Sequence, residues 1–128
     1  MPCTVLLADN SEIIRRALRS TILAHPRIQL VGEARSFGET LRMAEELKPE
    51  VVILDMHLPD VHVFSASQFC EKLRAHSRVV GISVYMDEHS EAISKQVGAL
   101  ALLDKANLSE TLLPTIFELM MQHNFAAA

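Results

Sequence analysis

Four polar side chains stand where short apolar runs of this 128-residue chain end, and they are its most informative residues chemically. In chain order they are Asp9, Asp55, Ser83 and, just beyond the last run, Lys105. The run before Asp55 shows no polar and apolar alternation, which is typical of a strand buried on both faces of a parallel sheet. Because the carboxyl ends of parallel strands share one edge, we expect the four side chains to converge on one crevice.

Their residue types suit phosphoryl transfer assisted by a metal ion. Oxygen ligands from Asp9, its neighbour Asn10 and Asp55 match the preference of Mg²⁺ for a few carboxylates, waters and a phosphate. Lys105 would meet a phosphoryl group as a point charge, and Ser83 would donate a hydrogen bond to it. The implied reaction is transfer of a phosphoryl group to a carboxylate, with Asp55 as the nucleophile.

Each of these residues also has an ordinary structural interpretation. The stretch from Asp9 to Ser11 is able to supply the N-cap of a following helix. Ser83 alone is typical of a turn, and Lys105 alone of a solvated surface. The interpretation as a site depends on the conjunction, because four independent polar residues at strand ends favour one shared purpose.

Short apolar runs alternate with amphipathic stretches along the whole chain, a pattern typical of α/β proteins with a parallel sheet. The five expected strands are Thr4 to Asp9, Ile28 to Gly32, Val51 to Asp55, Val79 to Ser83 and Ala101 to Leu103. We therefore predict βα units around a single sheet.

The first two helical stretches are the best defined. The first has apolar residues at helical spacing and three arginines that we interpret as its solvated face: Ile14, Ala17, Leu18 and Ile22, against Arg15, Arg16 and Arg19. Ser36 to Glu39 has the spacing of a capping box, and the helix that it begins should stop before Pro49.

Three more helices are expected from apolar residues at three- and four-residue steps. These residues are Ala66, Phe69, Cys70 and Leu73 for the third helix, Ile93 and Val97 for the fourth, and Leu112, Ile116, Leu119 and Met120 for the fifth. Gly98 should end the fourth helix. Because proline is harmless only in the first turn of a helix, the regular part of the fifth should begin close to Pro114.

Composition fits a single domain over residues 1–128, since 49% of the residues are hydrophobic and 22% are charged. A net charge of −4 without a basic run argues against direct nucleic-acid binding. We find neither a membrane-span pattern nor a signal-peptide layout, so we expect a cytoplasmic protein with no membrane contact. Cys3 and Cys70 are expected to be reduced, half-buried thiols.

The order and spacing of these residues resemble the receiver domain of two-component response regulators. The resemblance covers about residues 4–122 and rests on Asp9-Asn10, Asp55 with Pro59, Ser83, and Gly98-Ala99 leading to Lys105. The stretch from Pro26 to Ala34 further resembles the NarL/FixJ-type subgroup. Members of that subgroup usually carry a C-terminal helix-turn-helix DNA-binding domain, for which we find no counterpart in this chain.

The resemblance implies a flavodoxin-like, doubly wound five-stranded parallel sheet in the order 2-1-3-4-5, with five helices. It also implies that Asp55 is the phosphoacceptor and that Asp9, Asn10, Asp55 and the backbone carbonyl of His57 surround Mg²⁺. Ser83 would be the switch hydroxyl and Lys105 the phosphoryl-binding amine.

Several partners and limits follow from the same resemblance. The phosphoryl donor would be a histidine kinase or a phosphotransfer protein. The chain would catalyse only its own phosphorylation and hydrolysis, and it would not be an enzyme acting on other substrates. A homodimer would form through the fourth helix, fifth strand and fifth helix, and transcription regulation would be the output.

The chain departs from the family pattern at three positions. The second acidic residue is Asn10, which keeps an oxygen ligand but removes one negative charge from the metal site. Leu102 stands where an aromatic switch residue is common, and Val63 replaces a glycine eight residues after the phosphoacceptor. These departures leave open an alternative, a degenerate pseudo-receiver that acts as an interaction module without phosphorylation.

Two other enzyme or binding classes fit the sequence poorly. A haloacid-dehalogenase-like phosphatase needs a second acid two residues after its nucleophile, where this chain has His57. Neither common glycine-rich nucleotide-binding motif occurs. The histidines lack the helical pairing of a structural zinc site, although the side chains of His57 and Tyr85 are placed to overhang a phosphoryl group on Asp55.

Overall fold

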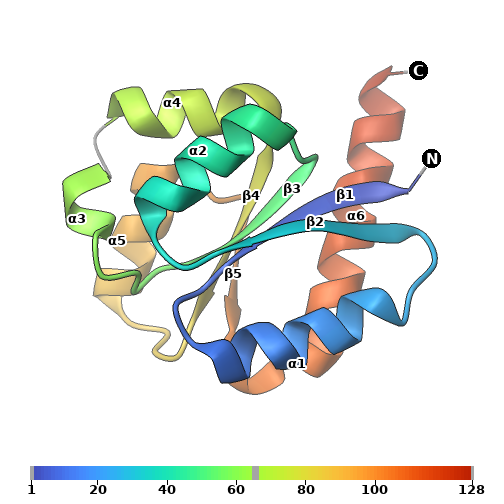
Figure 1. Ribbon diagram of the computed structural model, residues 1–128, viewed down its shortest axis with the longest axis horizontal. Helices are drawn as coiled ribbons and strands as arrows, with labels where there is room; N and C mark the ends of the chain where they lie inside the picture. The colour runs from blue at the N-terminus through green and yellow to red at the C-terminus, as the bar shows by residue number, and fades with distance from the viewer. Residues whose placement is uncertain (1, 65–66, 128) are drawn as a thin grey trace.

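The computed structural model describes residues 2–64 and 67–127 of the chain (Figure 1). Five strands form one sheet in the order β2-β1-β3-β4-β5, and every neighbouring pair is parallel. The strands are β1 (Cys3–Ala8), β2 (Ile28–Ala34), β3 (Val51–Asp55), β4 (Arg78–Ser83) and β5 (Ala101–Asp104). The predicted α/β class, strand order and positions of all five strands are confirmed.

The described residues form six α-helices and one 3-10 helix, η1 (Lys105–Asn107). The α-helices are α1 (Glu12–Leu23), α2 (Phe37–Leu47), α3 (Val61–Phe64), α4 (Ser67–His76), α5 (Glu88–Val97) and α6 (Leu108–Ala127). The prediction of five helices was wrong by one, because the short α3 precedes the expected third helix. Ala66, which contributed to that prediction, lies outside the described residues.

Helices cover both faces of the sheet: α1 and α6 lie on one side, and α2, α4 and α5 on the other (Figure 1). Successive strand residues point to opposite faces, so Leu6 and Ala8 pack with α2, α4 and α5, whereas Val5 and Leu7 pack with α1 and α6. This two-sided burial explains why β1 and β3 read as continuous apolar runs.

Helix α6 begins earlier than expected. We placed its start close to Pro114, but the helix runs from Leu108 and contains this proline in its second turn. The ring of Pro114 is on the exposed side, where water can satisfy the carbonyl that its missing N–H leaves free. Leu112 and Ile116 are fully buried on the other side, and this burial outweighs the lost hydrogen bond.

The predictions about the end of α5 and about the two cysteines can be compared with the structure. Gly98 ends α5 as expected, with a left-handed φ of 72° that suits a residue without a Cβ. Cys3 and Cys70 are not joined in a disulfide, and both are fully buried where we expected half burial. Burial raises the pKa of Cys3 to about 11, with a smaller contribution from Glu50, so this thiol is a packing residue.

Among residues 2–64 and 67–127, no helix combines the length and apolar character that crossing a lipid bilayer requires.

Candidate functional site

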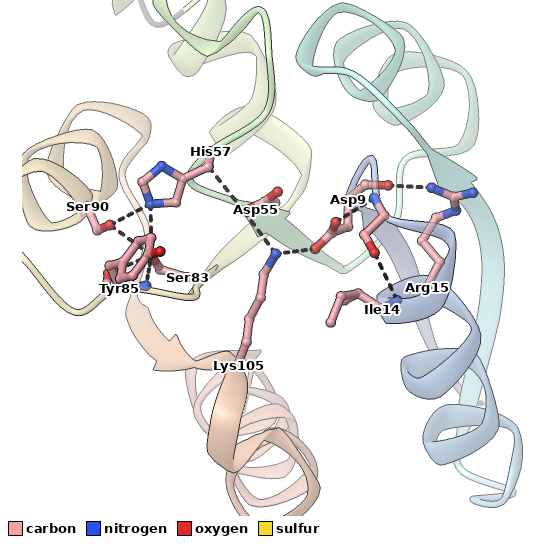
Figure 2. Close-up of polar contacts among 10 residues, drawn as sticks. Asp9, Ile14, Arg15, Asp55, His57, Ser83, Tyr85, Ser90 and Lys105 are labelled. Carbon is pink, nitrogen blue, oxygen red and sulfur yellow. Dashed lines mark hydrogen bonds and ion pairs between the residues drawn. The ribbon is translucent and has the colours of Figure 1, made fainter.

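Three of the four predicted strand-end residues meet at the carboxyl edge of the sheet (Figure 2). Nζ of Lys105, in η1, lies 2.7 Å from Oδ2 of Asp9 and 3.3 Å from Oδ1 of Asp55. Asp9 directly follows β1, and Asp55 is the last residue of β3. Their side chains are only 1% and 4% exposed, so the three charges interact away from bulk water.

The edge holds more negative than positive charge. Burial raises the pKa of Asp55, and the neighbouring carboxylate of Asp9 raises it further. Lys105 and the backbone amide of His57 act in the opposite direction, the amide by donating to Oδ1 of Asp55 at 3.0 Å. Two buried carboxylates thus share one ammonium group, an arrangement that favours an additional cation.

Asp9 is held by its main chain and by one carboxylate oxygen. Its amide donates to the carbonyl of Ala34 at 3.0 Å, and its Oδ1 accepts from the amide of Ser11 at 2.9 Å. Ser11 is the N-cap of α1, with Oγ accepting from the amide of Ile14. The capping role therefore falls to Ser11, which leaves Oδ2 of Asp9 facing Lys105.

Arg15 belongs to this site although we interpreted it as part of a solvated face. It is 5% exposed, and its Nη1 donates to the carbonyl of Asp9 at 2.7 Å (Figure 2). Its Nε pairs with Glu33 at 3.4 Å, and Arg19 binds the same carboxylate at 2.6 Å. Arg16 and Arg19, with side chains 73% and 40% exposed, fit the interpretation as a solvated face, and Arg15 does not.

The sequence did contain a signal for Arg15. Residues 15, 18 and 22 share one helical face, and Leu18 and Ile22 on that face are buried. The Glu33 carboxylate, whose pKa is lowered chiefly by its hydrogen bond with Arg19, comes from β2. Arg15 was misassigned because residue type was given more weight than position.

Asn10 and His57 flank the acidic pair. Asn10 is exposed, in the bend between Asp9 and α1. The backbone of His57 is tied to Asp55 through the amide bond described above, which places its peptide group beside the phosphoacceptor candidate. Their assignment as metal ligands stays a prediction.

Ser83 ends β4, one residue beyond Ile82, which pairs with Asp55. Its hydroxyl is fully buried and donates to the carbonyl of Tyr85 at 2.6 Å. The imidazole of His57 turns toward Ser83 and Ser90, each 3.1 Å from Nε2 (Figure 2). Sequence reasoning missed Ser90, because its arrival at the site depends on how α5 docks on the sheet.

The structure also shows the surroundings of Leu102 and Val63, two of the positions that depart from the family pattern. Leu102 packs against the core on the α2, α4 and α5 side and lies over Gly81, so no ring occupies this position. Val63 is in α3 and is 69% exposed. Asp60 anchors this loop by accepting from the amides of Phe37 and Gly38 at 2.7 and 3.0 Å.

The donor set fits a hard divalent cation. Oδ2 of Asp9 is buried and has the ammonium group of Lys105, 2.7 Å away, as its polar partner in the described part of the chain, so it keeps a further lone pair for a ligand. Across residues 2–64 and 67–127, no group of three or more His, Cys, Asp or Glu side chains is arranged for a metal. A Mg²⁺ ion here would need amide, carbonyl and water oxygens besides the two carboxylates.

A family model described as the response regulator receiver domain matches residues 5–117. The chain belongs to the response regulator receiver domain family. This receiver chain is 30% identical to the nitrate/nitrite response regulator protein NarL of Escherichia coli over 120 residues, which are 91% of this chain and 54% of NarL. The NarL-type resemblance predicted from the sequence is thereby confirmed.

Two further comparisons concern one more relative and one solved structure. A protein-glutamate methylesterase/protein-glutamine glutaminase of Myxococcus xanthus is 30% identical over 81% of this chain but only 30% of its own length. The response regulator domain of Thermotoga maritima CheB superposes with a TM-score of 0.79 at 24% identity, covering 94% and 97% of the two chains. The receiver chain spans about half the length of the transcriptional regulatory proteins it matches.

Proposed function

We propose that Asp55 is the phosphoacceptor of this receiver domain and that Lys105 binds the incoming phosphoryl group. The observation that carries the proposal is the contact of one ammonium group with two buried carboxylates at the carboxyl edge of the sheet. Oδ1 of Asp55 takes the contacts from Lys105 and from the amide of His57. We assign nucleophilic attack to Oδ2, the oxygen that neither group occupies.

We assign Mg²⁺ to Asp9, Asp55, Asn10 and the backbone carbonyl of His57. When bound, the ion would neutralise charge that develops on the transferred group. Arg15 holds the main chain of Asp9, and Lys105 is already oriented at the pair. Ser83 is the proposed hydroxyl that donates to a phosphoryl oxygen once it leaves Tyr85.

The phosphoryl donor in this proposal is a histidine kinase or a phosphotransfer protein, the partners with which receiver domains interact. Receiver domains are generally not enzymes, and we assign this one no activity beyond its own phosphorylation and dephosphorylation. We further propose that residues 1–128 form a single receiver domain without a DNA-binding domain. Its proposed homodimer face is formed by α5, β5 and α6. The cytoplasmic location and the lack of membrane contact stay predictions.

The test is intact-mass measurement after incubation with acetyl phosphate and Mg²⁺. The wild-type chain should gain one phosphoryl group that hydroxylamine removes, and Asp55→Ala should gain none. Asp104→Asn is the matched control, because it removes a strand-end carboxylate beside Lys105 that is used to cap η1. An unmodified wild type, beside a reference receiver that labels, would favour an interaction module that works without phosphorylation.

A further inference from the structure

A continuous set of hydrogen bonds joins residue 57 to the first turn of α5. Nε2 of His57 lies 3.1 Å from Oγ of Ser90 and 3.1 Å from Oγ of Ser83, and the two hydroxyls are 2.8 Å apart. Ser83 also donates to the carbonyl of Tyr85 and accepts from its amide at 3.2 Å. Figure 2 shows these groups beside the acidic pair but turned away from it.

Counting protons gives one order of donation that fits these distances. A hydroxyl has one proton and two lone pairs, and the proton of Ser83 goes to the carbonyl of Tyr85. The amide of Tyr85 fills one of its lone pairs, so the short contact with Ser90 is satisfied when Ser90 donates to Ser83. Ser90 can then accept from His57, if the imidazole carries its proton on Nε2. This assignment, with the proton of His57 on Nε2, gives the order His57 to Ser90 to Ser83 to Tyr85, and the carboxylate of Asp87 is a second acceptor within reach of the Ser90 hydroxyl.

In this arrangement the hydroxyl of Ser83 has no hydrogen-bonding capacity left. It can donate to a phosphoryl oxygen only by giving up the carbonyl of Tyr85, which lies in the exposed loop before α5. Residue 57 is tied to both ends of the system, by its backbone amide to Asp55 and by its ring to Ser90. A change at Asp55 therefore has a direct path of polar contacts to α5.

We propose that His57 is a positioning residue that, together with Ser90, holds the Ser83 hydroxyl in a resting orientation, and that release of this relay of hydrogen bonds carries the phosphoryl signal to α5. The inference rests on the proposed function of Asp55. It also supplies a route that needs no ring at position 102, where the partly buried Leu102 packs against the core. A ligand shifts such an equilibrium only by what it gains in one state over the other, so weakening the relay should favour the active state.

The experiment measures amide chemical shifts of the whole chain with and without BeF₃⁻ and Mg²⁺. Ser90→Ala and His57→Phe each remove one member of the relay, and His57→Gln restores an N–H donor of similar reach. In the first two variants the unliganded shifts of residues 84–90 should move toward their BeF₃⁻-bound values. The apparent affinity for BeF₃⁻ should rise about three- to tenfold, the equivalent of one lost resting hydrogen bond.

The matched control is His62→Gln, which removes an exposed imidazole near His89 that has only ring contacts in the described part of the chain. Recovery of wild-type shifts and affinity in His57→Gln would support the relay. If Ser90→Ala changes the shifts and the BeF₃⁻ affinity no more than His62→Gln does, the relay is overturned. This comparison holds even if His57→Phe does not fold. A wild-type chain that shows no response to BeF₃⁻ would instead overturn the proposed function of Asp55.

Discussion

The ammonium group of Lys105 lies 2.7 Å from Oδ2 of Asp9, a buried oxygen that has no other polar partner in the described residues. The amine thus provides the positive charge that this carboxylate requires in the absence of a metal ion. Any ion that binds to Asp9 must share the oxygen with Lys105 or displace the amine toward Asp55. The stability of the metal-free protein and its metal affinity are therefore coupled through Lys105.

Replacing Lys105 by methionine should separate the stability of the metal-free protein from the stability that Mg²⁺ adds. Loss of one member of a buried ion pair leaves uncompensated charge, so we expect the metal-free fold to lose roughly 3 kcal/mol. Saturating Mg²⁺ should recover about 2 to 3 kcal/mol, the linkage expected at a hundredfold excess over Kd. Thermal unfolding in EDTA and in Mg²⁺ measures both values.

Lys95→Met on exposed α5 is the control for that substitution, because it removes an equal charge far from the acidic pair. Equal stability of Lys105→Met and Lys95→Met in EDTA would show that Lys105 does not neutralise the pair.

Asp55→Asn should stabilise the protein at neutral pH. The pKa of Asp55 is raised in the folded state, chiefly by burial and then by Asp9, so its charged form opposes folding. The stability that its protonated form contributes is present below the unfolded pKa of about 3.9 and is lost as pH rises through the higher folded pKa. A neutral asparagine avoids that loss and leaves Lys105 paired with Asp9 alone, so the unfolding free energy at pH 7 should rise.

Urea unfolding at pH 7 and again near pH 3.5 tests the sign of this effect. The advantage of Asp55→Asn should shrink at the lower pH, where the wild-type carboxyl is itself becoming neutral. Glu118→Gln on the exposed side of α6 is the control for removal of a negative charge. A difference that grows as pH falls would mean that the pKa of Asp55 is lowered.

Arg15→Met should weaken the site as well as the fold. The substitution keeps the buried apolar stem but removes the 2.7 Å hydrogen bond to the carbonyl of Asp9. We expect a loss of about 1 to 3 kcal/mol in unfolding free energy, together with several-fold weaker Mg²⁺ binding. Arg16→Met, one residue along the helix and 73% exposed, should leave both quantities unchanged. Mg²⁺ titration by calorimetry that finds equal affinity in the two variants would contradict a positioning role for Arg15.

The sequence was sufficient to predict where strands end, and this in turn predicted the acidic pair and its lysine. Buried strands such as β3 have no polar alternation, so both their limits and the terminal Asp55 are visible in the residue pattern. Parallel pairing then brings Asp9 and Asp55 to one edge. These inferences need only local pattern and one topological rule, which explains why they agree with the structure.

The parts that were not predicted depend on tertiary contacts. Arg15 is buried because Glu33 comes from β2 and the carbonyl of Asp9 faces α1. Ser90 reaches His57 only after α5 packs on the sheet, and α3 forms in a loop that Asp60 anchors to α2. Polar residue type alone does not show which of these side chains acquires such a partner.

Asn10→Asp should tighten Mg²⁺ binding by about tenfold or more. Residue 10 is exposed beside Asp9, and a unit charge a few ångströms from a divalent ion contributes on the order of 1 to 4 kcal/mol at a partly exposed site. The same charge should destabilise the metal-free protein slightly, because it adds to a pair that already shares one lysine. Calorimetric titration of both proteins measures the affinities, and equal values would remove Asn10 from the proposed ligand set.

Pro114→Ala tests whether the proline inside α6 lowers the unfolding free energy of the protein. The ring removes one hydrogen bond within a helix that extends from Leu108, and an interior proline costs up to about 3 kcal/mol relative to alanine. Because position 114 is exposed and its neighbours Leu112 and Ile116 are buried, alanine should restore the bond without disturbing the core, raising the unfolding free energy by about 1 to 3 kcal/mol. Ser109→Ala in the first turn of the same helix serves as the control for helix propensity. Urea midpoints that rise equally in both variants would mean that the helix accommodates Pro114 without strain.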